Sequence, residues 1–124
     1  MNEKNTKKLC DDFPRIFPQP FYFECGDGWF NLIYKLCADI DSVCEKLKLS
    51  DHNWPHASQI KEKYGGLRFY TDCALNEVYD LIEAAENLSL VTCQGCGLPG
   101  KTRDGGWIRT LCDTCDALSN KQKV

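Results

Sequence analysis

The chain has 124 residues and a formal net charge of −3, which excludes a strong overall attraction to nucleic acid. Its hydrophobic content of 43% is ordinary for a globular protein, and its length suits one domain or a small domain with a metal-stabilised extension. The first ten residues are polar and rich in lysine, unlike a signal peptide, and no apolar run reaches the roughly 18–20 residues of a membrane-spanning helix. We therefore expect a cytoplasmic protein that does not enter a membrane.

Residues 1–12 are mostly polar, and we predict a flexible N-terminus there. Residues 10–24 contain Pro14, Pro18 and Pro20 among many aromatic side chains. Prolines at this density exclude a long helix. The pattern predicts an extended arm that covers the core, with an exposed aromatic binding strip as the alternative.

A helix is predicted over about 28–48, because apolar residues recur there at i, i+3, i+4 and i+7. Asp27 is a candidate N-cap for it. Cys37 and Cys44 lie on its apolar face, where buried inert thiols are expected more often than redox groups. The loop that follows holds His52 and His56, whose roles the sequence leaves open.

Residues 58–71 alternate between apolar and polar side chains around Gly65–Gly66, which predicts a β-hairpin with a two-residue turn. One face should pack on the preceding helix. The other face carries Lys61, Lys63, Arg68 and Tyr70. Such a mixture could bind phosphate or an acidic partner, or it could be a solvated face with cross-strand pairs.

A second helix is predicted over about 77–88, with Asn76 as its cap. Acidic residues recur every three positions along it, at Glu77, Asp80, Glu83 and Glu86. Stripes of this kind are usually solvated, although they would also suit a basic protein surface.

Nine cysteines are many for this length, and an odd number cannot all pair within the chain. Four of them form two C-x2-C pairs, Cys93/Cys96 and Cys112/Cys115, separated by the fifteen residues Gly97–Leu111. This spacing is typical of zinc sites, because each pair brings two sulfurs within reach of one ion. We therefore predict one structural Zn²⁺ held by four thiolates. Redox dithiols are the alternative.

Between the two pairs, residues 98–108 can form a hairpin around Asp104–Gly106, with Trp107 packed beside the metal. Residues 112–121 read as a short helix, whose N-terminus would favour thiolates. The order of these elements is that of a zinc ribbon or treble clef. The predicted fold class is α+β: a helix–β-hairpin–helix body at 13–90, after the flexible segment 1–12, with a four-cysteine zinc unit at 91–124 packed against it.

Two motifs, ECGDGWF at 24–30 and KEKYGGLRFY at 61–70, together with the cysteine pairs, give the chain a family resemblance. It resembles small, mostly uncharacterised proteins encoded by phages, prophages and bacteria, over roughly residues 13–115. The resemblance implies a cytoplasmic protein, located in the host cytoplasm if it is phage-encoded. It implies no activity, and it leaves the ligand set open because a histidine can stand for a cysteine in similar proteins.

The function that these observations favour is a non-enzymatic protein-interaction module, which could inhibit a host enzyme or a bacterial immune complex. Its partner and oligomeric state are not determined by the sequence. Because the two motifs carry charged residues without evident structural roles, we predict that a partner contacts Glu24, Asp27, Lys61, Lys63, Arg68 and Tyr70.

The sequence is also consistent with two alternative functions. A nucleic-acid-binding zinc finger would contact phosphates through Lys101, Arg103 and Arg109, because residues 93–124 carry five Lys and Arg against three Asp. A thiol or metal-dependent enzyme would need a nucleophile such as Cys25 with His52 or His56 as base. Four cysteine ligands leave no open position for catalysis on zinc. The sequence assigns no role to Cys10, Cys25 or Cys73.

Overall fold

The computed structural model describes residues 1–122 of the chain. Helices and short sheets together confirm the predicted α+β class. In chain order, the elements are α1 Glu3–Asp12, β1 Phe23–Glu24, α2 Phe30–Lys46, β2 Ala57–Lys63, β3 Gly66–Thr71, α3 Asn76–Ser89, β4 Lys101–Arg103, β5 Arg109–Leu111 and α4 Asp113–Gln122. Two short 3-10 helices, Asp27–Trp29 and Asp51–Asn53, precede α2 and β2.

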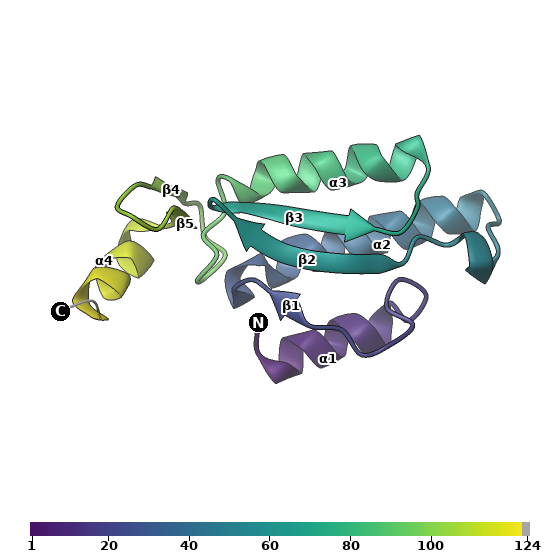
Figure 1. Cartoon of the computed structure of the whole chain (residues 1–124), viewed down its shortest axis with the longest axis horizontal. Coiled ribbons are helices and arrows are strands. Elements are labelled where there is room, and N and C mark those ends of the chain that lie inside the picture. Colours follow the sequence, from purple (N-terminus) through teal and green to yellow (C-terminus); the bar gives the residue numbers. More distant parts are fainter. Residues whose placement is uncertain (123–124) are drawn as a thin grey trace.

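A three-stranded sheet in the order β1-β2-β3 forms the centre of the body. β2 and β3 are antiparallel, with Ile60 opposite Phe69, whereas β1 runs parallel to β2. Figure 1 shows α2 behind this sheet, α1 on the β1 side, α3 on the β3 side, and β4, β5 and α4 together at one end. The opposite face of the sheet carries exposed side chains such as Gln59 and Tyr70, so it is open to solvent.

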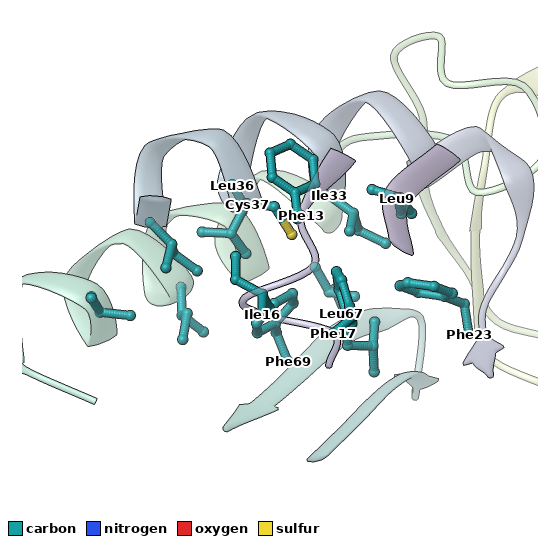
Figure 2. Close-up of a cluster of buried hydrophobic side chains, with 14 of the residues drawn as sticks. Leu9, Phe13, Ile16, Phe17, Phe23, Ile33, Leu36, Cys37, Leu67 and Phe69 are labelled. Atoms are coloured by element: carbon teal, nitrogen blue, oxygen red, sulfur yellow. The ribbon is translucent and has the colours of Figure 1, made fainter. Parts of the chain in front are cut away.

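One hydrophobic core joins the sheet to the helices (Figure 2). The proline-rich arm contributes Phe13, Ile16 and Phe17 to this core, all of them buried. The arm therefore covers the core, as its aromatic residues predict. The other labelled members come from the helices and strands: Leu9, Phe23, Ile33, Leu36, Cys37, Leu67 and Phe69.

The hairpin turn lies one residue earlier than predicted. Lys63 pairs with Gly66, so the two-residue connection is Tyr64–Gly65 and not Gly65–Gly66. Tyr64 and Gly65 have φ angles of +53° and +82°, a combination that suits the right-handed twist of a hairpin. Gly66 instead begins β3, where a Cβ atom would lie 3.2 Å from the Leu90 side chain.

Helix α1 occupies the segment that the sequence predicts to be flexible. Asn2 caps it, and Leu9 is buried in the core. The terminal ammonium of Met1 donates to the Cys25 carbonyl at 2.7 Å, and the Asn2 N–H donates to the Asp27 carboxylate at 2.7 Å. A single buried apolar residue cannot produce a helical period in the sequence, and these long-range contacts leave no local signal.

Neither predicted cap residue caps its helix. Asp27 lies in the 3-10 turn before α2, and no side-chain hydrogen bond caps that helix. Asn76 is already the first residue of α3, and Leu75 occupies the cap position. The Asp27 carboxylate is used instead by α1, which lies beside it.

Side chains of α3 satisfy the outer edge of β3. The Leu67 N–H donates to the Ser89 hydroxyl at 2.9 Å, and the Phe69 N–H donates to the Glu86 carboxylate at 3.0 Å. These bonds occupy donors that an exposed edge strand would offer to another chain. Glu86 therefore supports the sheet, although its spacing in the sequence groups it with a solvated acidic stripe.

We expect Ser89→Ala to lower the free energy of unfolding by about 1–3 kcal/mol, because the buried Leu67 N–H loses its acceptor. Urea denaturation followed by circular dichroism measures this change. Ser42 is exposed on α2, so Ser42→Ala is the matched control and should change stability by less than about 0.5 kcal/mol. Equal stability of the two variants would show that the Ser89 contact contributes nothing.

Candidate metal centre

Cys93, Cys96, Cys112 and Cys115 come together in one cluster, as their spacing predicts. Their sulfur atoms all lie within 4.8 Å of one another, and the Cys96 and Cys112 sulfurs are 3.6 Å apart. Four thiolates at about 2.3 Å from a zinc ion would have sulfurs about 3.8 Å apart. The cluster therefore has the dimensions of a tetrahedral four-thiolate site.

The first cysteine pair lies in a tight turn that follows α3, which we call the knuckle (residues 92–98). The Cys93 N–H donates to the Leu98 carbonyl and the Gly97 N–H donates to the Cys93 carbonyl, each at 2.8 Å. Gly97 has a φ of +84°, which side-chain-bearing residues rarely adopt. A glycine directly after Cys96 is thus part of how the turn holds its two sulfurs together.

The second pair lies at the beginning of α4. Cys112 precedes the helix and Cys115 is in its first turn, where the Cys115 N–H points to the Cys112 sulfur at 3.4 Å. The partial positive charge of a helix N-terminus favours thiolates at this position. The predicted arrangement of a ligand pair at a helix start is therefore present.

Backbone donors make Cys93 the acidic thiol of the cluster. Burial raises its pKa, but N–H groups of Cys112, Cys96 and Gly95 outweigh burial and lower the pKa of Cys93 to about 6. Burial and the neighbouring sulfurs raise the pKa of Cys115 to about 12. Four thiols this close cannot all ionise by themselves because the charges repel. A divalent cation compensates that charge, so the donor chemistry fits one metal ion.

Contacts from the Cys25–Trp29 segment hold the knuckle against the body. The Gly28 N–H donates to the Gln94 carbonyl at 3.0 Å, and the indole N–H of the buried Trp29 donates to the Thr92 carbonyl at 2.9 Å. A Cβ atom on Gly26 or Gly28 would lie 2.2 Å from a knuckle carbonyl oxygen. The glycines of the first motif are thus required by close backbone approach.

The β2–β3 turn contacts the same unit through Thr110. The Thr110 hydroxyl donates to the Gly65 carbonyl at 2.6 Å, and the Thr110 carbonyl accepts the Gln94 N–H at 3.0 Å. One buried residue of β5 therefore links the hairpin turn to the knuckle. Sequence reasoning missed Thr110 and Gln94, because a polar residue in a three-residue strand or a tight turn belongs to no periodic pattern.

Two of the basic side chains predicted to contact phosphates are engaged within the protein. Arg103 donates to the Asp113 carboxylate at 2.8 Å and lies 3.6 Å from the Asp116 carboxylate. Arg109 donates to a serine hydroxyl on α4 at 3.2 Å, whereas Lys101 is exposed. This surface therefore offers less positive charge than its sequence indicates.

The prediction that Trp107 packs beside the cysteine cluster is wrong. Its side chain has 70% of its surface exposed. Leu111, next to Cys112, pairs with Lys101 at the cysteine end of the β4–β5 hairpin, and Arg103 pairs with Arg109 at the other end. Trp107 lies in the loop beyond that second pair. The length of the hairpin thus places its ring away from the sulfurs.

The acidic residues predicted to meet a partner make contacts within the chain. The Asp27 carboxylate accepts hydrogen bonds from Asn2 and Asn5, at 2.7 and 3.2 Å. The Glu24 carboxylate accepts one from the Gln59 side chain at 3.0 Å. Asp27 therefore has a structural explanation, and a binding role for these two carboxylates stays a prediction.

The basic and aromatic residues predicted to meet a partner share the open face of the sheet. Lys61 lies directly opposite Arg68 across the β2–β3 ladder, and Tyr70 lies opposite Gln59. Lys63 is exposed two residues further along β2. These four side chains therefore form one surface, and its binding role also stays a prediction.

The structure does not bring Cys25 together with a histidine. Cys25 follows Glu24, which pairs with Lys61 on β2. His56 precedes Lys61 by five residues, which places it about 17 Å from Lys61 at roughly 3.3 Å per strand residue. His56 contacts the Asp72 carboxylate at 2.8 Å, and His52 is exposed in the second 3-10 turn. Burial raises the pKa of Cys25 to about 11, which disfavours its thiolate.

The other cysteines outside the cluster differ in exposure. Cys37 and Cys44 are buried on α2, as the apolar face of that helix predicts, and burial raises both pKa values. Cys10 is partly buried and Cys73 is exposed.

We expect purified protein to hold one zinc ion per chain and Cys96→Ser to lose it at chelator concentrations that the wild type withstands, because one of four thiolates is removed. Metal analysis by mass spectrometry measures the zinc content. Cys73→Ser, an exposed cysteine outside the cluster, should retain the metal. Disulfides among the four cysteines in reduced, metal-supplemented protein would contradict this assignment.

We expect Trp29→Phe to speed the release of zinc to a chelator, because the Thr92 carbonyl loses its donor and the knuckle is held less firmly. Trp54 is also buried and donates to Asp41 at 3.0 Å, so Trp54→Phe is the matched control. Both variants should lower the free energy of unfolding by about 1 kcal/mol. Equal rates of zinc release would show that the Trp29 contact does not secure the metal site.

Comparisons with models of protein families, with curated proteins and with solved structures find no match to this chain. None of the helices in the described part of the chain combines the length and the apolar character that crossing a bilayer requires. What the protein binds is therefore inferred from the cysteine cluster and from the surfaces of the molecule.

Proposed function

We propose that this chain is a zinc-stabilised, non-enzymatic module that binds another protein through the groove between α2 and α3. This groove is the observation that carries the proposal. It has a volume of about 200 Å³, and its apolar lining comes from Leu32 and Leu36 on α2 and from Leu81, Ala84, Ala85 and Leu88 on α3. Leu88 has 53% of its surface exposed. Apolar surface left open along two packed helices is a common site for a third helix.

The charges beside the groove indicate the kind of partner. Glu77 and Asp80 are exposed on α3, on the side of the helix that carries Ala84 and Leu88. Lys35 and Asp39, on the α2 side, pair with each other at 2.9 Å. The remaining charge is negative, so the groove suits an amphipathic helix with a basic flank.

The metal has a structural role in this proposal. Four thiolates close the coordination of zinc and leave no position for a substrate. The knuckle holds the residues directly before α2, through Gly28 and Trp29, and it follows directly after α3. Zinc would therefore fix the ends of both helices that line the groove, and it is the ion that this donor set favours.

The biological setting follows from the resemblance to phage and prophage proteins. A small module without a catalytic metal acts by covering a surface of its target. Inhibition of a host enzyme or of a bacterial immune complex, in the host cytoplasm, is the role that agrees with this mode of action.

We expect affinity purification from host-cell lysate to recover one stoichiometric protein that survives nuclease treatment, and Leu88→Asp to abolish its capture, because a charge in the groove opposes an apolar partner face. Calorimetry with the purified partner gives the loss of affinity. Leu118 is 55% exposed on α4, so Leu118→Asp is the matched control and should bind like the wild type. A partner captured equally by both variants would place the interface elsewhere.

A further inference from the structure

We infer that the open face of the sheet binds single-stranded nucleic acid, with phosphates on Lys61, Lys63 and Arg68 and bases on Tyr64 and Trp107. This surface is separate from the proposed protein-binding groove, because α2 lies behind the sheet and α3 runs along its β3 edge (Figure 1). It also differs from the basic residues of the cysteine unit, where Arg103 is neutralised by carboxylates.

The first observation is a cluster of cations that the protein does not neutralise. Lys61 and Arg68 lie directly opposite each other in the β2–β3 ladder, a like-charge pair that destabilises a sheet. In the described part of the chain, no side-chain nitrogen of Lys61, Lys63 or Arg68 lies within 4.0 Å of a carboxylate oxygen. Glu24 is the register partner of Lys61 on β1, but its carboxylate accepts from Gln59.

The hydrogen bonding of this cluster leaves most donors free. Arg68 uses Nη1 to contact the Leu67 carbonyl at 3.1 Å. Arginine has five N–H donors in a fork that matches phosphate oxygens. An anion bound between Arg68 and Lys61 would turn their repulsion into shared attraction.

The second observation is a cleft at the end of this face. It has a volume of about 380 Å³ and is lined by Lys61, Glu62, Lys63 and Tyr64 from the β2–β3 hairpin and by Gly106, Trp107 and Ile108 from the loop before β5. The Glu62 carboxylate accepts a hydrogen bond from the Gly65 N–H at 3.2 Å. Tyr64 and Trp107 expose 69% and 70% of their surfaces. Exposed aromatic rings beside cations are the side chains on which unpaired bases stack.

A third aromatic ring extends the surface to the other end of the sheet. Tyr70 lies four residues from Gly66, about 13 Å along β3 at roughly 3.3 Å per residue. It borders a second hollow, together with Tyr22. Cations between aromatic residues on an open sheet suit a chain in which phosphates alternate with planar bases. An acidic peptide would use the cations and leave the rings unexplained.

Stacking on the rings requires bases that are not paired, so single strands are favoured over duplex. The ring of Trp107 is positioned by the β4–β5 hairpin, which Thr110 fastens to the Gly65 carbonyl at 2.6 Å. One wall of the cleft therefore depends on the cysteine unit, and removal of zinc should weaken binding.

The experiment is a titration of the full-length, zinc-loaded protein with oligothymidylate of about ten nucleotides. Trp29 and Trp54 are buried, so a change in tryptophan fluorescence on binding reports on Trp107. Fluorescence anisotropy of labelled oligonucleotide gives the affinity. We expect Trp107→Ala and Tyr64→Ala each to weaken binding about fivefold to a hundredfold. The logarithm of the binding constant should fall with the logarithm of salt concentration, with a slope of about −2 for three phosphate contacts.

Matched variants separate this inference from the protein-binding proposal. Arg68→Glu should abolish oligonucleotide binding, whereas Lys46→Ala, an exposed lysine at the end of α2, and Leu88→Asp in the groove should leave it unchanged. Circular dichroism and zinc content show that each variant is folded.

Three outcomes would overturn the inference: no binding at about 50 mM salt, equal affinity for duplex of the same length, or no effect of Trp107→Ala and Tyr64→Ala. Competition by polyglutamate at equal charge concentration, with the aromatic variants unaffected, would assign the face to an acidic peptide instead.

Discussion

The Gly28 N–H donates to the Gln94 carbonyl at 3.0 Å, and the rest of the structure depends on the backbone approach that this hydrogen bond requires. It joins the start of α2 to the knuckle that holds Cys93 and Cys96. A side chain on Gly26 or Gly28 would meet a carbonyl oxygen at 2.2 Å, so the contact permits only glycine at these positions. Because the same turn carries Cys93 and Cys96, binding of a metal ion at the cysteine cluster would be coupled to the stability of the body.

Both motifs outside the cysteine pairs find their explanation in this coupling. The CGDGW segment holds the knuckle from one side, and the turn of the KEKYGGLRFY hairpin holds Thr110 from the other. Asp27 serves the same region differently, by accepting hydrogen bonds from α1. A body of this size gains from such a staple, because a short chain buries only a modest core. The cysteine unit thereby holds the ends of the helices that line the groove and forms one wall of the aromatic cleft.

The two proposed binding surfaces lie on different parts of the molecule and differ in charge. The groove between α2 and α3 is apolar with an acidic flank, whereas the open face carries Lys61, Lys63 and Arg68 without carboxylate partners in the described chain. A net charge of −3 conceals this division, because opposite charges on separate faces cancel in the sum but not at contact distance. Binding on one face is compatible with binding on the other.

The sequence by itself determined the elements that depend on local pattern: the amphipathic helices near 28–48 and 77–88, the hairpin, and the grouping of Cys93, Cys96, Cys112 and Cys115, whose spacing is typical of metal sites. Only the tertiary structure decided what depends on contacts between distant residues. It folded residues 3–12 into α1 against Cys25 and Asp27, moved the turn to Tyr64–Gly65, tied Arg103 to two carboxylates and turned Trp107 outward. Such contacts leave no periodic trace in the chain, because each depends on the position of a backbone or charge tens of residues away.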